Sequence, residues 1–217
     1  MLPDTSHHGH AEHFESLEQQ AHAAHLGMWV FLASEVLLFS GLFTLYAVSR
    51  LQNAAGFENG LAHSEKLIGS INTAILLTSS YAVASAVLSL RAGNRRLAFG
   101  LVLTTMGLGL SFVALKLYEY SLHFREGIWP GGRGAMFDRY RVPGVESFWT
   151  LYYVMTGLHV FHVLAGLCTL AWISWKIENG TVVAPHDYPL SLAAMYWHLV
   201  DVIWIVLWPL FYLTGGA

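Results

Sequence analysis

A histidine and an aspartate, His198 and Asp201, stand three residues apart in the otherwise apolar run 189–213. Residues at this spacing share one face of a helix. The run is long enough to cross a bilayer. Ionisable side chains are costly in hydrocarbon and mark a functional site at that depth, so this pair is the first candidate for chemistry.

Three more ionisable residues, Glu35, His159 and His162, lie at a similar depth in other apolar runs. With about 1.5 Å of rise per residue, all of these side chains fall roughly 13–21 Å from the start of their runs, near the middle of a ~30 Å hydrocarbon core. We expect them to face the bundle interior and to meet each other or ordered water, because an unpaired charge facing lipid costs at least ~2.5 kcal/mol. The Glu35 carboxyl is therefore predicted to be hydrogen-bonded and turned away from lipid.

The predicted buried polar network comprises Glu35, Glu119, His159, His162, His198 and Asp201. Such groups suit a proton relay, a set of haem or metal ligands, or a satisfied polar core that fixes helix packing. Ligation is disfavoured, because His159 and His162 lie one turn apart on one helix and cannot bracket a porphyrin. A di-iron site would need Glu-x-x-His motifs from paired helices, and the spans contain none. We therefore predict no metal site and no catalytic residue, while the relay and packing hypotheses both stay open.

The composition is that of an integral membrane protein. Of 217 residues, 55% are hydrophobic and only 12% are charged, against about 25% charged residues in a soluble domain. A net charge of -3 provides no basic patch, so nucleic acid is not an expected partner. The single cysteine, Cys168, supports neither a disulfide framework nor a CxxC metal or haem-attachment motif.

The apolar runs predict an all-α membrane protein, a bundle of five transmembrane helices at about 26–49, 68–90, 97–121, 148–175 and 189–213. No run alternates polar and apolar residues, which disfavours barrel strands. Residues 26–217 are predicted to form the transmembrane domain, preceded by a flexible tail at 1–25. The tail is rich in histidine, and we interpret it as a solvated terminus rather than a metal site. Its histidines are His7, His8, His10, His13, His22 and His25.

Cationic side chains flank the predicted helices. They are candidates for binding anionic lipid headgroups, with ordinary anchoring at the membrane surface as the alternative. These residues are Arg50, Lys66, Arg91, Arg95 and Arg96.

The order and content of five segments match a known family. The segments are 27–36 (GMWVFLASEV), 71–77 (INTAILL), 116–120 (KLYEY), 156–166 (TGLHVFHVLAG) and 196–204 (YWHLVDVIW). In these segments the chain resembles subunit III of the haem–copper respiratory oxidases, in its short five-helix form. The resemblance extends over nearly the whole chain from Leu26 onward.

The resemblance implies an accessory subunit of a proton-pumping terminal oxidase in aerobic respiration. The family's subunit III carries no haem or copper; these belong to partner subunits that reduce O₂ to water. It packs mainly against the catalytic subunit I, with subunit II and small subunits as further partners. It is thought to stabilise subunit I and to support proton uptake from the inner side. The expected location is the bacterial cytoplasmic membrane, with the N-terminus and its tail inside and the C-terminus outside.

Two further expectations follow from the resemblance. Phospholipid binding is expected, although longer members build one arm of their lipid cleft from two helices that residues 1–25 cannot supply. The triplet Ser34-Glu35-Val36 resembles the cytochrome c oxidase pattern and makes cytochrome c the expected electron donor, with a quinol oxidase as the alternative.

A rival of another class is a small ion or proton transporter that uses the midplane Glu, His and Asp groups. A transporter would be expected to show internal repeats or broken helices, and only Pro209 interrupts a span.

Overall fold

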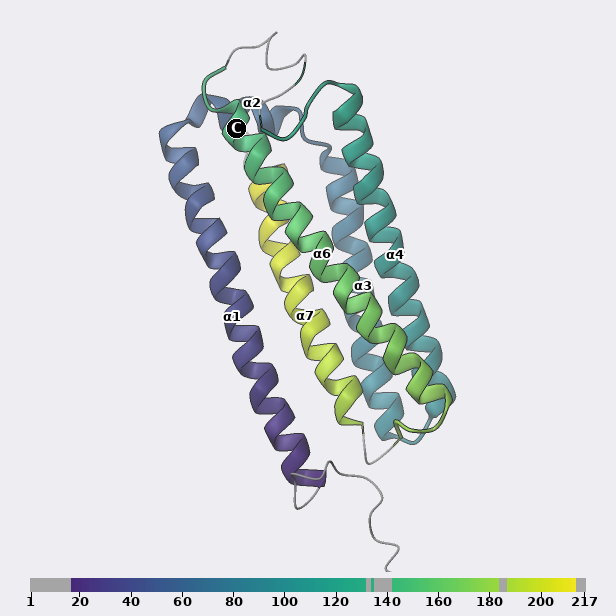
Figure 1. Ribbon diagram of the computed structural model, residues 1–217. Helices are drawn as coiled ribbons and strands as arrows, with labels where there is room; N and C mark the ends of the chain where they lie inside the picture. The colour runs from purple at the N-terminus through teal and green to yellow at the C-terminus, as the bar shows by residue number, and fades with distance from the viewer. Residues whose placement is uncertain (1–16, 132–133, 135–141, 184–186, 214–217) are drawn as a thin grey trace, which may run out of the picture.

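The computed structural model describes residues 17–131, 134, 142–183 and 187–213. Five of its helices are long and apolar enough to cross a membrane, which confirms the predicted all-α bundle. They run side by side, and the short helix α2 lies across one end of the bundle (Figure 1). The elements are α1 (Leu17–Gln52), α2 (Ala54–Ala62), α3 (Lys66–Arg91), α4 (Arg95–Arg125), α6 (Val145–Glu178), α7 (Tyr188–Trp208) and the π-helical turn η1 (Pro209–Leu213).

The predicted boundary between tail and first helix is wrong. Helix α1 begins at Leu17, so residues 17–25 are helical rather than a flexible tail. This polar segment is rich in Glu, Gln and Ala, which are strong helix formers, and Glu18 in the first turn suits the positive end of the helix dipole. Apolar run length therefore marked the membrane-buried part of α1 and missed its polar extension. The histidines of residues 1–16 lie outside the described residues.

Helix α1 stands at the edge of the bundle (Figure 1). It packs against α6 and α7, whereas α3 and α4 form the most extensive pair of the remaining body. Its outward side chains, such as Leu26, Leu37 and Leu51, are mostly exposed. Because hydrocarbon is the solvent at this depth, such apolar exposure is expected for a helix that faces lipid or a partner subunit.

The centre of the body is organised around Trp197 on α7, a fully buried side chain. Its indole lies between two helices at positions where glycine leaves room for it. A methyl group on Gly109 of α4 would approach the ring to 2.7 Å, and one on Gly166 of α6 would approach it to 2.9 Å. The indole N–H donates to the Ser79 hydroxyl on α3 at 3.0 Å. One side chain thus fixes the spacing of four helices.

We expect Gly109→Ala to lower the thermal unfolding midpoint of the detergent-solubilised protein. The added methyl group must displace the buried Trp197 ring, and overpacking of this kind costs about 1–3 kcal/mol. Gly107→Ala is the matched control on the same helix, because a methyl group there meets no atom within 4 Å. The control should be neutral or slightly stabilising, since alanine is the better helix former. Equal midpoints for the two variants would contradict this packing.

Candidate functional site

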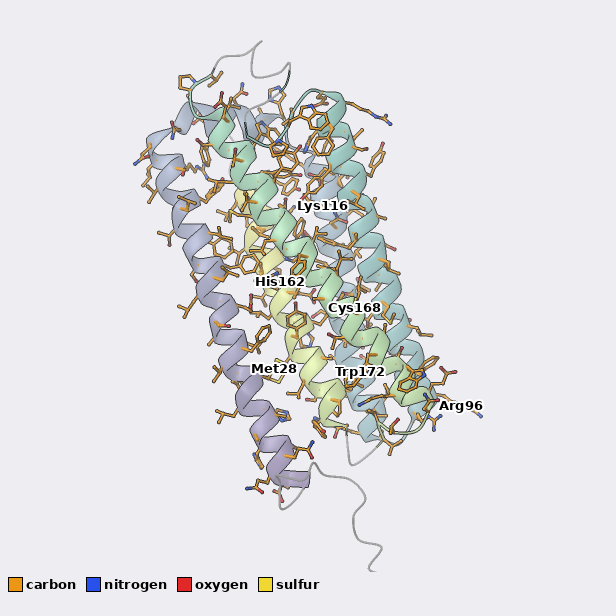
Figure 2. The ribbon with its side chains drawn as sticks, in the orientation of Figure 1. Met28, Arg96, Lys116, His162, Cys168 and Trp172 are labelled. Carbon is orange, nitrogen blue, oxygen red and sulfur yellow. The ribbon has the colours of Figure 1, made fainter. Side chains whose placement is uncertain are left out.

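A buried ion pair between Lys116 and Glu119 lies in the upper half of the bundle (Figure 2). Both side chains have no exposed surface. The Lys116 ammonium donates to Glu119 Oε2 at 3.0 Å, to Tyr152 Oη at 2.9 Å and to Tyr212 Oη at 2.6 Å. An ammonium group has three N–H donors, so all of them are used.

The two tyrosines close the cluster on the carboxylate. Tyr152 and Tyr212 each donate their hydroxyl proton to Glu119 Oε1, at 2.6 and 2.7 Å. Each hydroxyl therefore accepts from the lysine and donates to the glutamate. A buried charge is tolerated only when it is paired and hydrogen-bonded, and this cluster meets both conditions.

The cluster joins helices that are distant in the sequence. Lys116 and Glu119 lie three residues apart on α4, and Tyr152 comes from α6. Tyr212 comes from η1, the π-helical turn that begins at Pro209, and its ring packs over Gly69 of α3. Proline cannot donate an i→i−4 hydrogen bond, which accounts for the change in winding at this residue.

Sequence reasoning identified Glu119 but missed Lys116, Tyr152 and Tyr212 as its partners. The Lys-x-x-Glu spacing on one helix face was a usable signal for Lys116. No local signal identified the tyrosines, because each reaches Glu119 only through tertiary packing.

A second pair joins α1 to α6 near the middle of the bundle, where Figure 2 labels His162. His162 Nδ1 donates to the Leu158 carbonyl at 2.8 Å, because a carbonyl can only accept. Its Nε2 lies 2.9 Å from Glu35 Oε2, and both side chains are mostly buried. One proton occupies this contact, so the pair is neutral overall whichever group holds it. The Glu35 carboxyl is therefore hydrogen-bonded and mostly buried between α1 and α6. Its orientation relative to lipid stays a prediction.

His198 and Asp201 meet a serine rather than another ionisable residue. His198 Nδ1 lies 2.7 Å from Ser80 Oγ on α3. Asp201 is buried, and the Ser80 hydroxyl lies beside its carboxyl group. Neither carboxyl oxygen makes a hydrogen bond of good geometry within the described part of the chain.

His159 is fully buried between aromatic rings. Its ring lies 5.5 Å from Phe112 and 5.2 Å from Trp204, measured between ring centroids. Neither ring nitrogen has a hydrogen-bond partner among the described residues. The expected single network therefore divides into separate sets, because each set is built where two or three particular helices meet.

Some of the cations proposed for lipid headgroups bind the chain itself. Arg91 Nε donates to Asp187 Oδ2 at 2.7 Å, which links the end of α3 to the residue before α7. Arg95 donates to the backbone carbonyl of Glu178 at the end of α6. Lys66 and Arg96 are exposed at helix starts, and Arg50 lies in the last turn of α1. Headgroup binding stays a prediction for these residues.

The described residues contain no group of three or more His, Cys, Asp or Glu side chains arranged to hold a metal ion. The paired groups neutralise each other and join helices. The unpartnered groups, His159 and Asp201, offer hydrogen-bonding positions inside the bundle. The paired groups contribute to helix packing, and the relay hypothesis stays open for the paired and the unpartnered groups alike.

We expect Lys116→Met to destabilise the protein strongly, because it leaves a buried carboxylate without its cation. Breaking a buried pair costs about 3–5 kcal/mol, whereas replacing both members is often close to neutral. The double variant Lys116→Met/Glu119→Gln should therefore unfold at a higher temperature than Lys116→Met alone. Lys66→Met is the matched control, because Lys66 is exposed at a helix start. Additive losses in the double variant would contradict the ion pair.

Glu35→Leu should loosen α1 while leaving the rest of the bundle intact. A hydrogen bond to a charged group contributes about 1.5–3 kcal/mol, so amide exchange in α1 should accelerate by roughly tenfold or more. Hydrogen exchange measured by mass spectrometry can compare α1 with α4, which serves as the internal reference. Glu35→Gln should exchange more slowly than Glu35→Leu, since its amide can donate to His162 Nε2. Unchanged exchange in α1 for both variants would rule out this anchoring role.

Comparison with known proteins identifies the family. The family model for cytochrome c oxidase subunit III matches residues 6–137 and 143–216. Quinol oxidase subunit 3 of Bacillus subtilis (strain 168) is 28% identical, over 95% of this chain and 97% of its own length. Cytochrome c oxidase subunit 3 of Synechocystis sp. is 31% identical, over 86% of this chain and 74% of its own. Cytochrome c oxidase subunit 3 of Thermostichus vulcanus is 32% identical, over 87% of this chain and 86% of its own length. With its five helices of membrane-spanning length, the chain belongs to the cytochrome c oxidase subunit III family.

Proposed function

We propose that this chain is an accessory, cofactor-free subunit of a proton-pumping terminal oxidase, in which partner subunits holding haem and copper reduce O₂ to water. The observation that supports this proposal is that buried ionisable groups of the chain pair with each other. Lys116 with Glu119, and Glu35 with His162, satisfy each other inside the bundle instead of converging as ligands. This arrangement supports a scaffold that stabilises subunit I, its main partner, with subunit II as a second one.

Support of proton uptake is the second part of the proposed role. The bundle keeps several proton-carrying groups at depth, and the Glu35–His162 contact can hold its proton on either side chain. In the proposed orientation the N-terminus lies inside the cell. Arg91, Arg95, Arg96 and Lys176 then lie on the cytoplasmic side and six loop cations lie outside, so the positive-inside tendency does not favour this orientation. The proposed orientation rests on the family resemblance.

Cytochrome c is the proposed electron donor. The support is Glu35 within Ser34-Glu35-Val36, the pattern that resembles the cytochrome c oxidases. A quinol oxidase is the alternative, because the relatives at comparable identity include quinol oxidase subunits as well.

A bound phospholipid is also part of the proposal. A groove of about 480 Å³ between α1, α6 and α7 is lined mainly by apolar side chains, with Met28 and Trp172 on its opposite walls (Figure 2). Lys176 lies in its lining, and its ammonium group is 3.8 Å from the centre of the Trp172 ring. An acyl chain fits such a groove, and the lysine can bind an anionic headgroup.

Affinity purification through this chain in mild detergent tests the proposal. We expect a larger partner that carries haem and copper absorbance, and we expect this colour to be lost when the chain is isolated. Turnover of that complex with reduced cytochrome c, compared with quinol, then identifies the donor. A haem signal that stays with the isolated chain, or the absence of any coloured partner, would contradict the accessory role.

A further inference from the structure

The outer surface where α3 meets α7 carries a polar group that the chain leaves only half satisfied. His198 lies near the middle of α7 and is partly exposed. Its Nδ1 is bonded to Ser80 on α3, which places the ring at the line where the two helices touch. Its Nε2 makes no hydrogen bond with the described part of the chain. Nε2 is not among the buried atoms without a partner, so it is accessible from outside the chain near the middle of a helix of membrane-spanning length.

Other polar side chains on the outer surface differ from His198, because their hydroxyl groups are satisfied within their own helices. Thr78, Thr104 and Ser111 each donate a hydroxyl proton to the backbone carbonyl four residues earlier in their own helix. They need nothing from outside and are compatible with lipid. An imidazole has two nitrogens, and acyl chains offer no hydrogen-bonding group to the second one.

The surroundings of His198 form a continuous outward face. On α7, Val202 and Ile205 follow His198 at helical spacing and are 55% and 44% exposed. On α3, Leu77 and Tyr81 lie next to the Ser80 contact and are 50% and 76% exposed. The Tyr81 hydroxyl is a second polar group on this surface, well inside α3 rather than at its ends.

We propose that this α3–α7 face, formed by Leu77, Ser80, Tyr81, His198, Val202 and Ile205, binds a transmembrane helix of a partner oxidase subunit. The partner helix presents a hydroxyl, amide or carboxyl group to His198 Nε2. Hydrogen bonds of this kind join helices in membranes, where lipid cannot replace them. The inference rests on the proposed function, because that function supplies the membrane-embedded partner.

Site-specific photo-crosslinking in the intact complex tests this face. p-Benzoylphenylalanine in place of Val202 should form a covalent adduct with the haem-bearing subunit, identified by mass spectrometry. The matched control replaces Leu110 on α4, which is 56% exposed and outside this face. We expect no protein adduct there. An adduct from position 110 and none from 202 would overturn the proposal.

Amide variants of His198 separate its two nitrogens. The amide of glutamine reaches the position of the ring Nε2, whereas the shorter asparagine amide reaches that of Nδ1. We expect His198→Gln to keep the partner during purification and His198→Asn to lose most of it, although His198→Asn retains the contact with Ser80. The reverse order would show that the inward contact matters and would refute the outward one.

The outcomes also distinguish this inference from the proposed function. If the unmodified chain brings no haem-bearing partner, the proposed function fails. If it brings the partner but position 202 gives no adduct with it, only the α3–α7 face is wrong.

Discussion

The structure depends on the requirement that no charge remain unpaired inside a bilayer. Lys116 meets this requirement through three acceptors, and Glu119 through the same lysine and two tyrosine hydroxyls. Removing any member leaves a buried charge or donor unsatisfied. Because Tyr212 belongs to the last turn of the described chain, the same cluster also fixes how the C-terminal helix ends against α3, α4 and α6.

The edge helix α1 also pairs its buried carboxyl group, but it is attached to the other helices by fewer polar contacts. It is joined to the body by apolar contacts, by the Glu35–His162 pair and by the Tyr46 hydroxyl, which donates to the Leu210 carbonyl at 2.6 Å. The Glu35–His162 contact is a single hydrogen bond, whereas the Lys116–Glu119 cluster contains five. The groove lined by Met28 and Trp172 lies beside this attachment.

The ionisable groups of the interior thus fall into three kinds. His159 and Asp201 are buried without a hydrogen bond of good geometry among the described residues. The pairs Lys116–Glu119 and Glu35–His162 satisfy each other and join helices, which supports the proposed accessory role. His198 is of the third kind, because its Nδ1 is bonded inside the chain whereas its Nε2 has no hydrogen bond with the described residues. An oxidase subunit must be stable in lipid and still recognise its neighbours at membrane depth. The proposed recognition rests on His198, which shares a largely apolar face with the hydroxyl groups of Ser80 and Tyr81.

The sequence by itself determined the class of protein, the five spans and most ionisable residues of the interior, because hydrocarbon imposes run length and makes buried charge rare. Its family motifs likewise indicated the family that the comparison confirmed. Tertiary structure alone decided the pairings. Glu35 and His162 are far apart in the chain, as are Glu119 and Tyr212, and helical spacing carries no information about which helices become neighbours. The polar start of α1 was missed for a related reason. The length of an apolar run indicates only the part of a helix that crosses the bilayer, whereas the polar residues 17–25 also favour a helix.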